Sequence, residues 1–579
     1  MTLGSITFFD IGDAYWIRER VDSDAYLTIV KDQDYAQVHT ARKVMEFLEK
    51  NITVLPWPAN FPGLNPIEHI WAHLKRELVL TMFKFPGYSS SSLSLTFTEK
   101  KMPSKGISIY SYISVEGYEV EFTVPAASVL NTANDNFTPK HLEIDASHIP
   151  GLHFVGRFQW SVLLHGQVVA SAYNDINSMT GKLSGGNMTA TVDFVPIVTD
   201  NAIITYGFYA AGPGNVGLPR RHQCYVTICS TNNISWMGAV APPGSLAAQK
   251  PFSRFVLAAP HDNGMNSMTS CDAFFTAAYA DIVSDMKEHL PCLRFFEHLP
   301  DHLLLRRLPN IVYGVAITQK KEIPLMLHLG ARYFEFRPAK LLPIIRKVSS
   351  LPDKYYFQHS CIPGLAFDEF LSQQVAFLDE NPTEFVVIHI RWDGVVSKCE
   401  RPSSQVIEDM LNEACSQSIQ HSLTWGGRDC FVKSIDSLRQ SGTRLICVIN
   451  AEKYDSWTAK AYATLTPEPI LERFEAMNTA GQEGTDLTIL QCQATSQSIK
   501  EVLVYSVLSA HAATSCLTST KAHLDSQTLP WIRKNALDKL QADKTIVVMN
   551  DFIDGATTDT AIQLSRRRLV SEDGNSEVN

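Results

Sequence analysis

The chain has 579 residues, which is more than one ordinary domain uses. Apolar residues make up 45% and charged residues 19%, so the chain can bury hydrophobic cores and is not disordered as a whole. The 50 Lys and Arg residues against 60 Asp and Glu residues give a formal net charge of −10, which argues against a chain-wide basic surface for nucleic acid.

The N-terminal region combines helical stretches with a linker. Residues 37–49 and 67–79 have helical patterns within a segment 1–80, and residues 81–104 form a Ser-rich linker. From 105 to 250, short β-rich runs alternate with Gly, Asn and Pro clusters. This alternation predicts an all-β, sandwich-like accessory domain with antiparallel strands, although a barrel stays open.

The C-terminal region, residues 251–564, alternates apolar strand-like runs with helical stretches such as 367–380 and 404–419. Continuous apolar strands separated by helices indicate a parallel sheet covered on both faces, and about seven of them suit an α/β, TIM-like (β/α)8 barrel. The strand-like runs are 255–260, 330–337, 354–360, 385–392, 444–450, 487–493 and 545–552. We expect residues 565–579 to be a loose tail.

The chain offers no obvious way into or across a membrane. No apolar run reaches the ~18 residues that a membrane-spanning helix needs. The N-terminus has no basic start and already carries Asp10 and Asp13, so it does not read as a signal peptide. We expect a cytoplasmic or peripheral-membrane location.

Residues 22–79 carry a specific motif set. Asp34, Ala36 and His39 precede the run Leu-Pro-Trp-Pro-Ala at 55–59, and Leu-Asn-Pro-Ile-Glu at 64–68 precedes Trp71 and Lys75. The combination resembles the C-terminal half of the Tc1/mariner-like transposase catalytic domain, an α/β, RNase H-like fold. That resemblance implies two-metal phosphoryl transfer, with Asp34 as the second carboxylate and Glu68 as the third.

This transposase-like segment departs from the family pattern. The first carboxylate and the helix-turn-helix region have no convincing counterpart, and Phe-Pro-Gly stands at 61–63 where the family usually has Ser-Pro-Asp. We therefore expect a non-catalytic relic, either a transposon fragment fused to the gene or a gene-model error. Mg²⁺ would matter only if the fragment were active, and nucleic acid is not the expected partner.

Polar residues stand at the ends of successive predicted strands of the C-terminal region. They are His261-Asp262-Asn263, Glu335 with Arg337, His359, and Arg391 with Asp393. Because the carboxyl ends of parallel barrel strands meet at one mouth, these groups should converge. Two His with a carboxylate and an Arg would form an acid/base pair with an anion clamp. His328 and His389, within a helix and a strand body, are better assigned to structure.

The motifs around these residues resemble the phosphatidylinositol-specific phospholipase C X-box family, most closely the fungal PLC-like phosphodiesterases. They lie at 259–265, 330–338, 356–359, 377–388, 454–457 and 549–552. The resemblance implies that His261 is the general base on the inositol 2-hydroxyl, His359 the general acid, and Arg337 the phosphate clamp.

The same resemblance implies supporting roles for the remaining residues. Asp262 or Glu335 would orient Arg337 or a histidine, and Asp551 could hold the tautomer of His261. The substrate would meet Arg391, Asp551 and Tyr454. The β-rich region 105–250, which carries no catalytic motif, would pack on the barrel or contact a membrane.

One position bears on the metal question. Calcium-dependent relatives have an acidic residue where this chain has Arg337, so the metal-independent form is favoured and Ca²⁺ is the alternative. Asn263-Gly264 stands where Ser-Gly is usual, and Glu335 replaces an Asp of the bacterial form. The stretch between His261 and Glu335 is also longer than a simple barrel step.

The leading interpretation is a phosphoric diester hydrolase acting on a phosphoinositide or another phosphodiester, with peripheral membrane contact left open. One alternative is a catalytically weak PLC-like protein that binds phosphoinositide or membrane. Another is a transposase-derived nucleic-acid-binding protein. A glycerophosphodiester substrate is a further alternative, but that enzyme class needs a metal-binding acidic cluster that Arg337 does not favour.

Overall fold

The computed structural model describes most of the chain beyond residue 105, and all of the described residues belong to one compact unit, residues 87–579. Asp34, Glu68 and Tyr454 lie outside the described residues. The described ranges are 106–132, 137–149, 154–188, 196–211, 218–267, 269–271, 313–314, 316–320, 322–347, 349–419, 422–449, 455–477, 487–494, 517–540 and 543–570.

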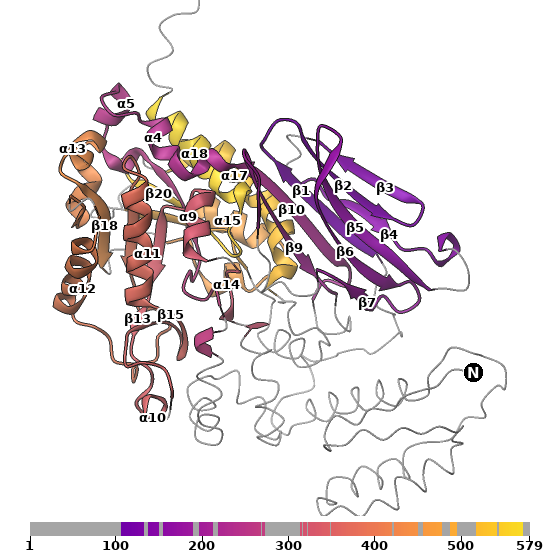
Figure 1. The fold of residues 1–579 in the computed structure, drawn as a ribbon, viewed down its shortest axis with the longest axis horizontal. Helices are drawn as coiled ribbons and strands as arrows, with labels where there is room; N and C mark the ends of the chain where they lie inside the picture. Colours follow the sequence, from indigo (N-terminus) through magenta and orange to yellow (C-terminus); the bar gives the residue numbers. More distant parts are fainter. Residues whose placement is uncertain are drawn as a thin grey trace, which may run out of the picture. The chain divides into compact units, whose positions relative to one another are not determined.

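Two five-stranded sheets form the first part of this unit (Figure 1). The first has the order β4-β1-β10-β9-β8, and the second has the order β3-β2-β5-β6-β7. The strands are β1 (Gly106–Ile113), β2 (Tyr118–Val124), β3 (Ala127–Asn131), β4 (Lys140–Glu143), β5 (Val155–Leu164), β6 (Gln167–Asn177), β7 (Leu183–Gly186), β8 (Ile197–Val198), β9 (Ala202–Tyr209) and β10 (His222–Ser230). Apolar residues of both sheets share one core, as in the predicted sandwich.

One strand pair departs from the predicted antiparallel pattern. Strands β1 and β10 run parallel, with Ile107 opposite His222 and Ile113 opposite Ile228. A pattern of apolar residues gives the faces of a strand but not its direction, so this pairing could not be predicted from the runs themselves.

The sheet that contains β9 and β10 is covered on both faces. Every residue of β9 is buried, whereas β2 in the other sheet alternates buried and half-buried residues. The second cover is supplied by helices α17 (Thr518–Lys539) and α18 (Gly555–Leu569). On this side Tyr112 of β1 donates a hydrogen bond of 3.2 Å to Asp559 of α18. The sandwich is therefore packed against the second part of the fold.

Seven parallel strands form the second part, as two sheets ordered β19-β20-β11 and β12-β16-β18-β17. The strands are β11 (Val256–Pro260), β12 (Tyr333–Phe336), β16 (Val386–Ile390), β17 (Thr424–Gly426), β18 (Thr443–Ile449), β19 (Leu487–Gln491) and β20 (Thr545–Asn550). The amide of Arg332, just before β12, donates to the carbonyl of Ala258 in β11 at 3.1 Å and links the two sheets. Six of the seven predicted parallel strands are thus present in a mixed α/β fold, to which β17 is an addition. The described ladders form two sheets rather than one closed ring.

Helices cover these sheets. Figure 1 shows α11, α12 and α13 beside β18, and α12 also contacts β17. Helices α11 and α12 confirm the predicted helical stretches at 367–380 and 404–419, the second of which ends at 416, whereas the stretches at 37–49 and 67–79 lie outside the described residues. The bounds are α4 (Trp236–Val240), α5 (Leu246–Gln249), α9 (Ile323–Leu329), α10 (Pro343–Arg346), α11 (Phe367–Glu380), α12 (Ser404–Ser416), α13 (Ile435–Gln440), α14 (Ala459–Tyr462) and α15 (Glu468–Ala476). Among the described residues, no helix combines the length and apolar character needed to cross a bilayer.

The run predicted as a parallel strand at 354–360 is instead part of an antiparallel sheet. Strand β14 (Tyr356–His359) pairs with β13 (Pro338–Ala339) and with β15 (Ile362–Ala366). The turn between β14 and β15 passes through Ser360, whose φ of 61° lies in the left-handed region. The prediction of strand direction was wrong because a two-residue connection permits only an antiparallel partner.

The prediction that a loose tail begins at residue 565 was also wrong. Helix α18 continues to Leu569. Ser565 is fully buried there, where its hydroxyl accepts from the amide of Val256 at 2.8 Å and donates to the carbonyl of Val256 at 2.9 Å. The polar composition of the segment concealed a helix end whose Ser565 side chain is buried and hydrogen-bonded to the backbone of β11.

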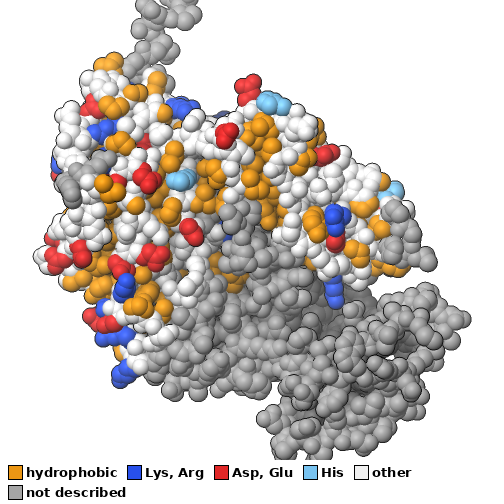
Figure 2. All heavy atoms as spheres, viewed as in Figure 1, with side chains coloured by type: hydrophobic (Ala, Val, Ile, Leu, Met, Phe, Trp, Pro, Cys, Tyr) orange, Lys and Arg blue, Asp and Glu red, His pale blue; other side chains and the backbone are white. Residues whose placement is uncertain are grey.

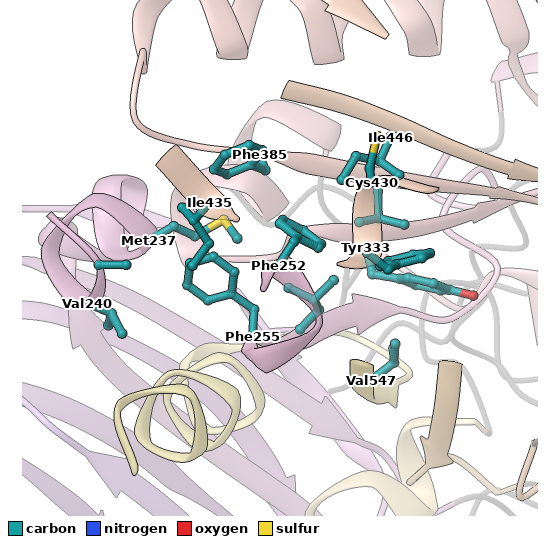
Figure 3. Packing of buried hydrophobic residues seen from close by; sticks show 14 of the residues in the cluster. Met237, Val240, Phe252, Phe255, Tyr333, Phe385, Cys430, Ile435, Ile446 and Val547 are labelled. Atoms are coloured by element: carbon teal, nitrogen blue, oxygen red, sulfur yellow. The ribbon is translucent and has the colours of Figure 1, made fainter. Parts of the chain in front are cut away.

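Aromatic and aliphatic side chains fill the space between the sheets and the helices (Figure 3). Phe252 lies in edge-to-face contact with Phe255 at 5.5 Å and with Phe385 at 5.2 Å between ring centroids. Figure 2 shows acidic, basic and apolar side chains interspersed over the described part of the face in view. Acidic and basic groups are therefore not segregated on that face.

A buried ion pair holds the start of β12 in this core. Arg332 and Glu384 are both inaccessible to solvent, and the guanidinium contacts the carboxylate at 2.7 and 3.0 Å. The same carboxylate accepts the amides of Met237 at 3.2 Å and Gly238 at 2.8 Å in α4. One carboxylate therefore joins β12 to the first turn of a neighbouring helix.

Replacing Glu384 by Gln should lower the free energy of unfolding by ~3 to 5 kcal/mol, because it leaves a buried guanidinium without its counter-charge. Denaturant titration followed by circular dichroism measures this loss. Asp175→Asn is the control, since it removes the partner of Arg157 in an exposed pair of the sandwich, where the effect should be far smaller. Equal losses in the two variants would show that the Arg332 pair is not an important support of the fold.

Candidate active site

The structure brings together seven of the residues that the sequence singles out. They occupy the carboxyl ends of β11, β12, β16 and β20, together with the end of the β14 hairpin. The group comprises His261, Asp262, Glu335, Arg337, His359, Arg391 and Asp551. The expected convergence therefore exists, although β14 reaches the site from an antiparallel hairpin rather than from a parallel strand.

The carboxylate of Asp262 lies at the centre of this group. Its Oδ1 is 2.6 Å from a guanidinium nitrogen of Arg337 and 3.7 Å from Nε2 of His261. Its Oδ2 is 3.6 Å from Nε2 of His359. Asp262 is almost fully buried, and burial alone would raise its pKa. The charge of Arg337, with those of the two histidines, outweighs burial and lowers the pKa of Asp262.

The backbone at Asp262 is strained in order to aim this side chain. Its φ is 44°, in the left-handed region that residues with a Cβ rarely adopt, at a cost of about 1 kcal/mol. The amide of Met265 donates to the carbonyl of Asp262 at 2.8 Å and closes a tight turn directly after β11. The turn places His261 and Asp262 side by side over the strand end.

His261 is held by a second carboxylate. Its Nδ1 lies 2.8 Å from Oδ1 of Asp551, which follows β20. Burial disfavours the charged imidazole, but Asp262 and Asp551 together outweigh it and raise the pKa of His261 to about 9. Burial also raises the pKa of Asp551, a change that His261 opposes. The pair orients the ring so that Nε2 faces Asp262.

His359 has the opposite bias. Burial lowers its pKa, and the charges of Arg337 and His261 add to this effect against the pull of Asp262. Its Nδ1 has no hydrogen-bond partner within the described protein. The two imidazoles beside one carboxylate therefore prefer different protonation states, with His261 charged and His359 neutral.

Glu335 links two guanidiniums. It is 1% exposed, and its carboxylate lies 2.9 Å from Arg337 and 3.2 Å from Arg391. Arg391 also contacts Asp393 at 2.9 Å and Asp455 at 3.2 Å. Asp455 has no role in the sequence-based site, and its place beside Tyr454 in a family-like motif was the only signal for it.

Three residues with groups suited to a metal ion also meet here. Suitable atoms of His261, Asp262 and Glu335 lie within 4.8 Å of one another. The guanidinium of Arg337 already contacts both carboxylates, at 2.6 and 2.9 Å. A cation placed between these carboxylates would have to displace that guanidinium or lie beside its charge, so the residues fit Arg337 better than a divalent ion.

Comparisons with known proteins give two separate likenesses. The family model of the DDE superfamily endonucleases matches residues 19–86. The Tcb2 transposase of Caenorhabditis briggsae is 36% identical over 64 residues, which are 11% of this chain and 22% of the relative. The Tc3 transposase of Caenorhabditis elegans is 32% identical over 72 residues, 12% of this chain and 22% of the relative. The chain thus spans about a fifth of the length of the curated relatives it matches.

The second likeness is to solved structures. The phosphatidylinositol-specific phospholipase C from Listeria monocytogenes superimposes with a TM-score of 0.33 and 12% identity, covering 57% of this chain and 98% of that chain. One from S. aureus gives 0.33 and 14%, covering 57% of this chain and 97% of that chain. The two likenesses are thus to DDE-type transposases over residues 19–86 and to phosphatidylinositol-specific phospholipase C over 57% of the chain.

The raised pKa of His261 makes the stability of the fold depend on pH. The folded-state pKa of about 9 lies above the ordinary value of 6.5, so the stabilisation is complete below pH 6.5 and is lost as pH rises through 9. The free energy of unfolding of the wild type should exceed that of His261→Gln by up to ~3 kcal/mol near pH 6, and by little near pH 10. Urea titrations across this range measure the difference.

Asp551→Asn tests the cause of that pH dependence. Without this carboxylate the remaining pull of Asp262 is partial, so the stability of the variant should fall less steeply between pH 6.5 and 9. An unchanged slope in Asp551→Asn would contradict the assignment of the pair.

Proposed function

We propose that this site is a phosphodiesterase centre that acts on a phosphodiester with a neighbouring hydroxyl, of the phosphoinositide class. The observation that carries the proposal is the pair of imidazole Nε2 atoms, 3.7 and 3.6 Å from the two oxygens of Asp262, with Arg337 on the same carboxylate. Two imidazoles supply a base and an acid, and the guanidinium supplies charge for the phosphoryl oxygens.

His261 is the base. The contact of Nδ1 with Asp551 favours the tautomer that leaves the Nε2 lone pair free. That nitrogen takes the proton of the substrate hydroxyl as its oxygen attacks phosphorus. A P–O bond forms between that oxygen and phosphorus, the P–O bond to the leaving alcohol breaks, and a cyclic phosphate results.

His359 is the acid that protonates the departing oxygen. In the free protein its lowered pKa leaves it mostly neutral, but an anionic phosphodiester adds negative charge and raises that pKa. The reaction needs a neutral His261 and a protonated His359. Because the free protein favours the opposite arrangement, the productive protonation state is a minor one. The rate is still bell-shaped in pH, since one limb reports each histidine.

Arg337 and Arg391 receive the phosphate. Only 12% and 11% of their side chains are exposed, and both are already aligned by Glu335. A planar guanidinium can hold two phosphoryl oxygens at once, which a Lys cannot. This internal charge supports a reaction without a metal. The complete set of acid, base and clamp also favours catalysis over mere binding of the same lipid.

Activity toward an inositol phosphodiester should persist in EDTA and should fall by roughly 10²-fold in Arg337→Lys, because the point charge of Lys loses the planar fork. Initial rates with and without EDTA measure both effects. Arg346→Lys, at a half-exposed arginine paired with Glu400, is the control and should keep the wild-type rate. Loss of activity in EDTA with recovery on addition of Ca²⁺ would show that the site takes a metal.

The two histidines should respond differently to the leaving group. His261→Ala should lose activity on substrates with an alkyl or an aryl leaving group. His359→Ala should retain much more activity on the aryl substrate, because a nitrophenolate departs without protonation. The measurement is kcat/KM for both variants on both substrates.

Three outcomes of that comparison are decisive. Equal damage to both substrates in His359→Ala would remove His359 as the acid. The reverse pattern, with His261→Ala rescued by the aryl group, would exchange the two roles. Wild-type rates in both variants would refute a phosphodiesterase centre built on this pair.

A further inference from the structure

A short segment from the long stretch between β11 and β12 reaches the back of the catalytic turn. Residues 316–320 are described, and Thr318, Gln319 and Lys320 are 4%, 0% and 5% exposed. They lie in the stretch that is too long for a simple strand-helix-strand step. None of the three is among the residues that the sequence marks as functional, and their side chains are polar although they are buried.

Thr318 makes hydrogen bonds to two turns beside the site, one after β11 and one after β20. Its hydroxyl lies within hydrogen-bond distance of the carbonyls of His261, at 3.0 Å, and of Asp262, at 3.1 Å. Its own carbonyl accepts from the amide of Phe552 at 2.7 Å. Asp262 and Phe552 have φ values of 44° and 45°, so two of the left-handed residues beside the site are tied to this one threonine.

Gln319 bridges the same two turns through its side chain. Its Nε2 donates to the carbonyls of His261 at 2.9 Å and Asn550 at 3.0 Å. Its Oε1 accepts from the amide of Ile553 at 2.9 Å. The amide therefore ties the turn after β11 to the turn after β20. These are the turns that carry His261 and Asp551, whose side chains are hydrogen-bonded to each other.

Lys320 connects this segment to the sandwich. Its ammonium group donates to the carbonyl of Tyr206 in β9. It also lies 5.7 Å from the ring centroid of Tyr206 and 5.4 Å from that of Tyr225 in β10. A charge with 5% exposure needs such partners, so this contact fixes the segment against the sandwich.

We propose that Thr318, Gln319 and Lys320 form a positioning strap through which the β-sandwich holds His261, Asp262 and Asp551 in their catalytic geometry. The strap touches no substrate and acts on the reacting groups through the backbone of their turns. This role rests on the proposed phosphodiesterase function. Through this strap the sandwich would help to position the reacting groups, in addition to packing against the rest of the fold.

The test compares Thr318→Val, which keeps the shape and removes the hydroxyl, with the wild-type full chain. We expect kcat on the inositol phosphodiester to fall by about 10 to 10²-fold with little change in KM, because a small misplacement of the base slows chemistry more than binding. Thr227→Val is the matched control. It removes a buried hydroxyl that lies 2.6 Å from that of Thr205 within the sandwich, so it should cost similar stability and leave kcat unchanged.

A second readout does not depend on activity. Diethyl pyrocarbonate reacts with the neutral imidazole, so its rate at the His261 peptide, followed by mass spectrometry against pH, gives the pKa of that residue. The charged and titratable groups that face His261 are Asp262, Glu335, His359 and Asp551, with Lys521 acting on Asp551. Released turns weaken these contacts, so the midpoint should move from about 9 in the wild type toward 6.5 in Thr318→Val.

The outcomes separate the strap from the function. An unchanged midpoint and unchanged kcat in Thr318→Val, with the stability loss of Thr227→Val, would overturn the strap. A shifted midpoint in Thr318→Val, together with a wild-type protein that cleaves no phosphodiester, would uphold the strap and refute the proposed function. Lys320→Met keeps the stem without the charge and should shift the midpoint in the same direction. No shift in that variant would overturn the part assigned to the sandwich.

Discussion

The arrangement of the site follows from the burial of one carboxylate. Asp262 is 1% exposed, and an ionised group at such a position requires compensation by nearby positive charge. Arg337 supplies it at 2.6 Å, Glu335 then balances Arg337, and Arg391 balances Glu335. The same requirement pairs His261 with Asp551. Each buried carboxylate of the centre thus has a cation, and a phosphodiester would enter a set of charges that is already close to balance.

That balance has a consequence for catalysis. A guanidinium held by two carboxylates needs little reorganisation when charge develops on a phosphoryl group, because its position is fixed before the substrate arrives. Asp262 and Asp551 raise the pKa of His261 and so reduce the fraction of its free base at neutral pH. In the proposed reaction, His261 would therefore be a base of smaller population but of greater strength and fixed direction.

Several features of the fold could be predicted from the sequence. The apolar runs that became β11, β16, β18, β19 and β20 are continuous, and their polar ends mark the mouth where the site lies. The direction of β14 and of the β1–β10 pair was missed because strand direction is set by connections and neighbours rather than by side-chain pattern. The end of α18 was missed because Ser565 and Arg568 are polar and yet buried, which a hydrophobicity pattern does not distinguish from a surface.

The candidate site was predictable for similar reasons and incomplete for others. His261, Arg337 and His359 are found by residue type and by their place after strand-like runs. Thr318 and Gln319 carry no such mark, because their effect depends on backbone carbonyls that only the folded turns present to them. Asp455 is far from Arg391 in the sequence and does not follow a strand directly. Only the folded chain brings the two side chains into contact.

The sandwich is better understood as part of the α/β fold than as an attached module. Strands β9 and β10 are buried on both faces, by the other sheet on one side and by α17 and α18 on the other. Separating the two parts would expose Tyr225, Cys229 and the ion pair of Lys521 with Asp525 to water or leave them without their cover. These buried contacts join the two parts into one compact unit. The sandwich can therefore transmit its rigidity to the turn of His261, whereas a flexibly linked domain could only bring the site to its substrate.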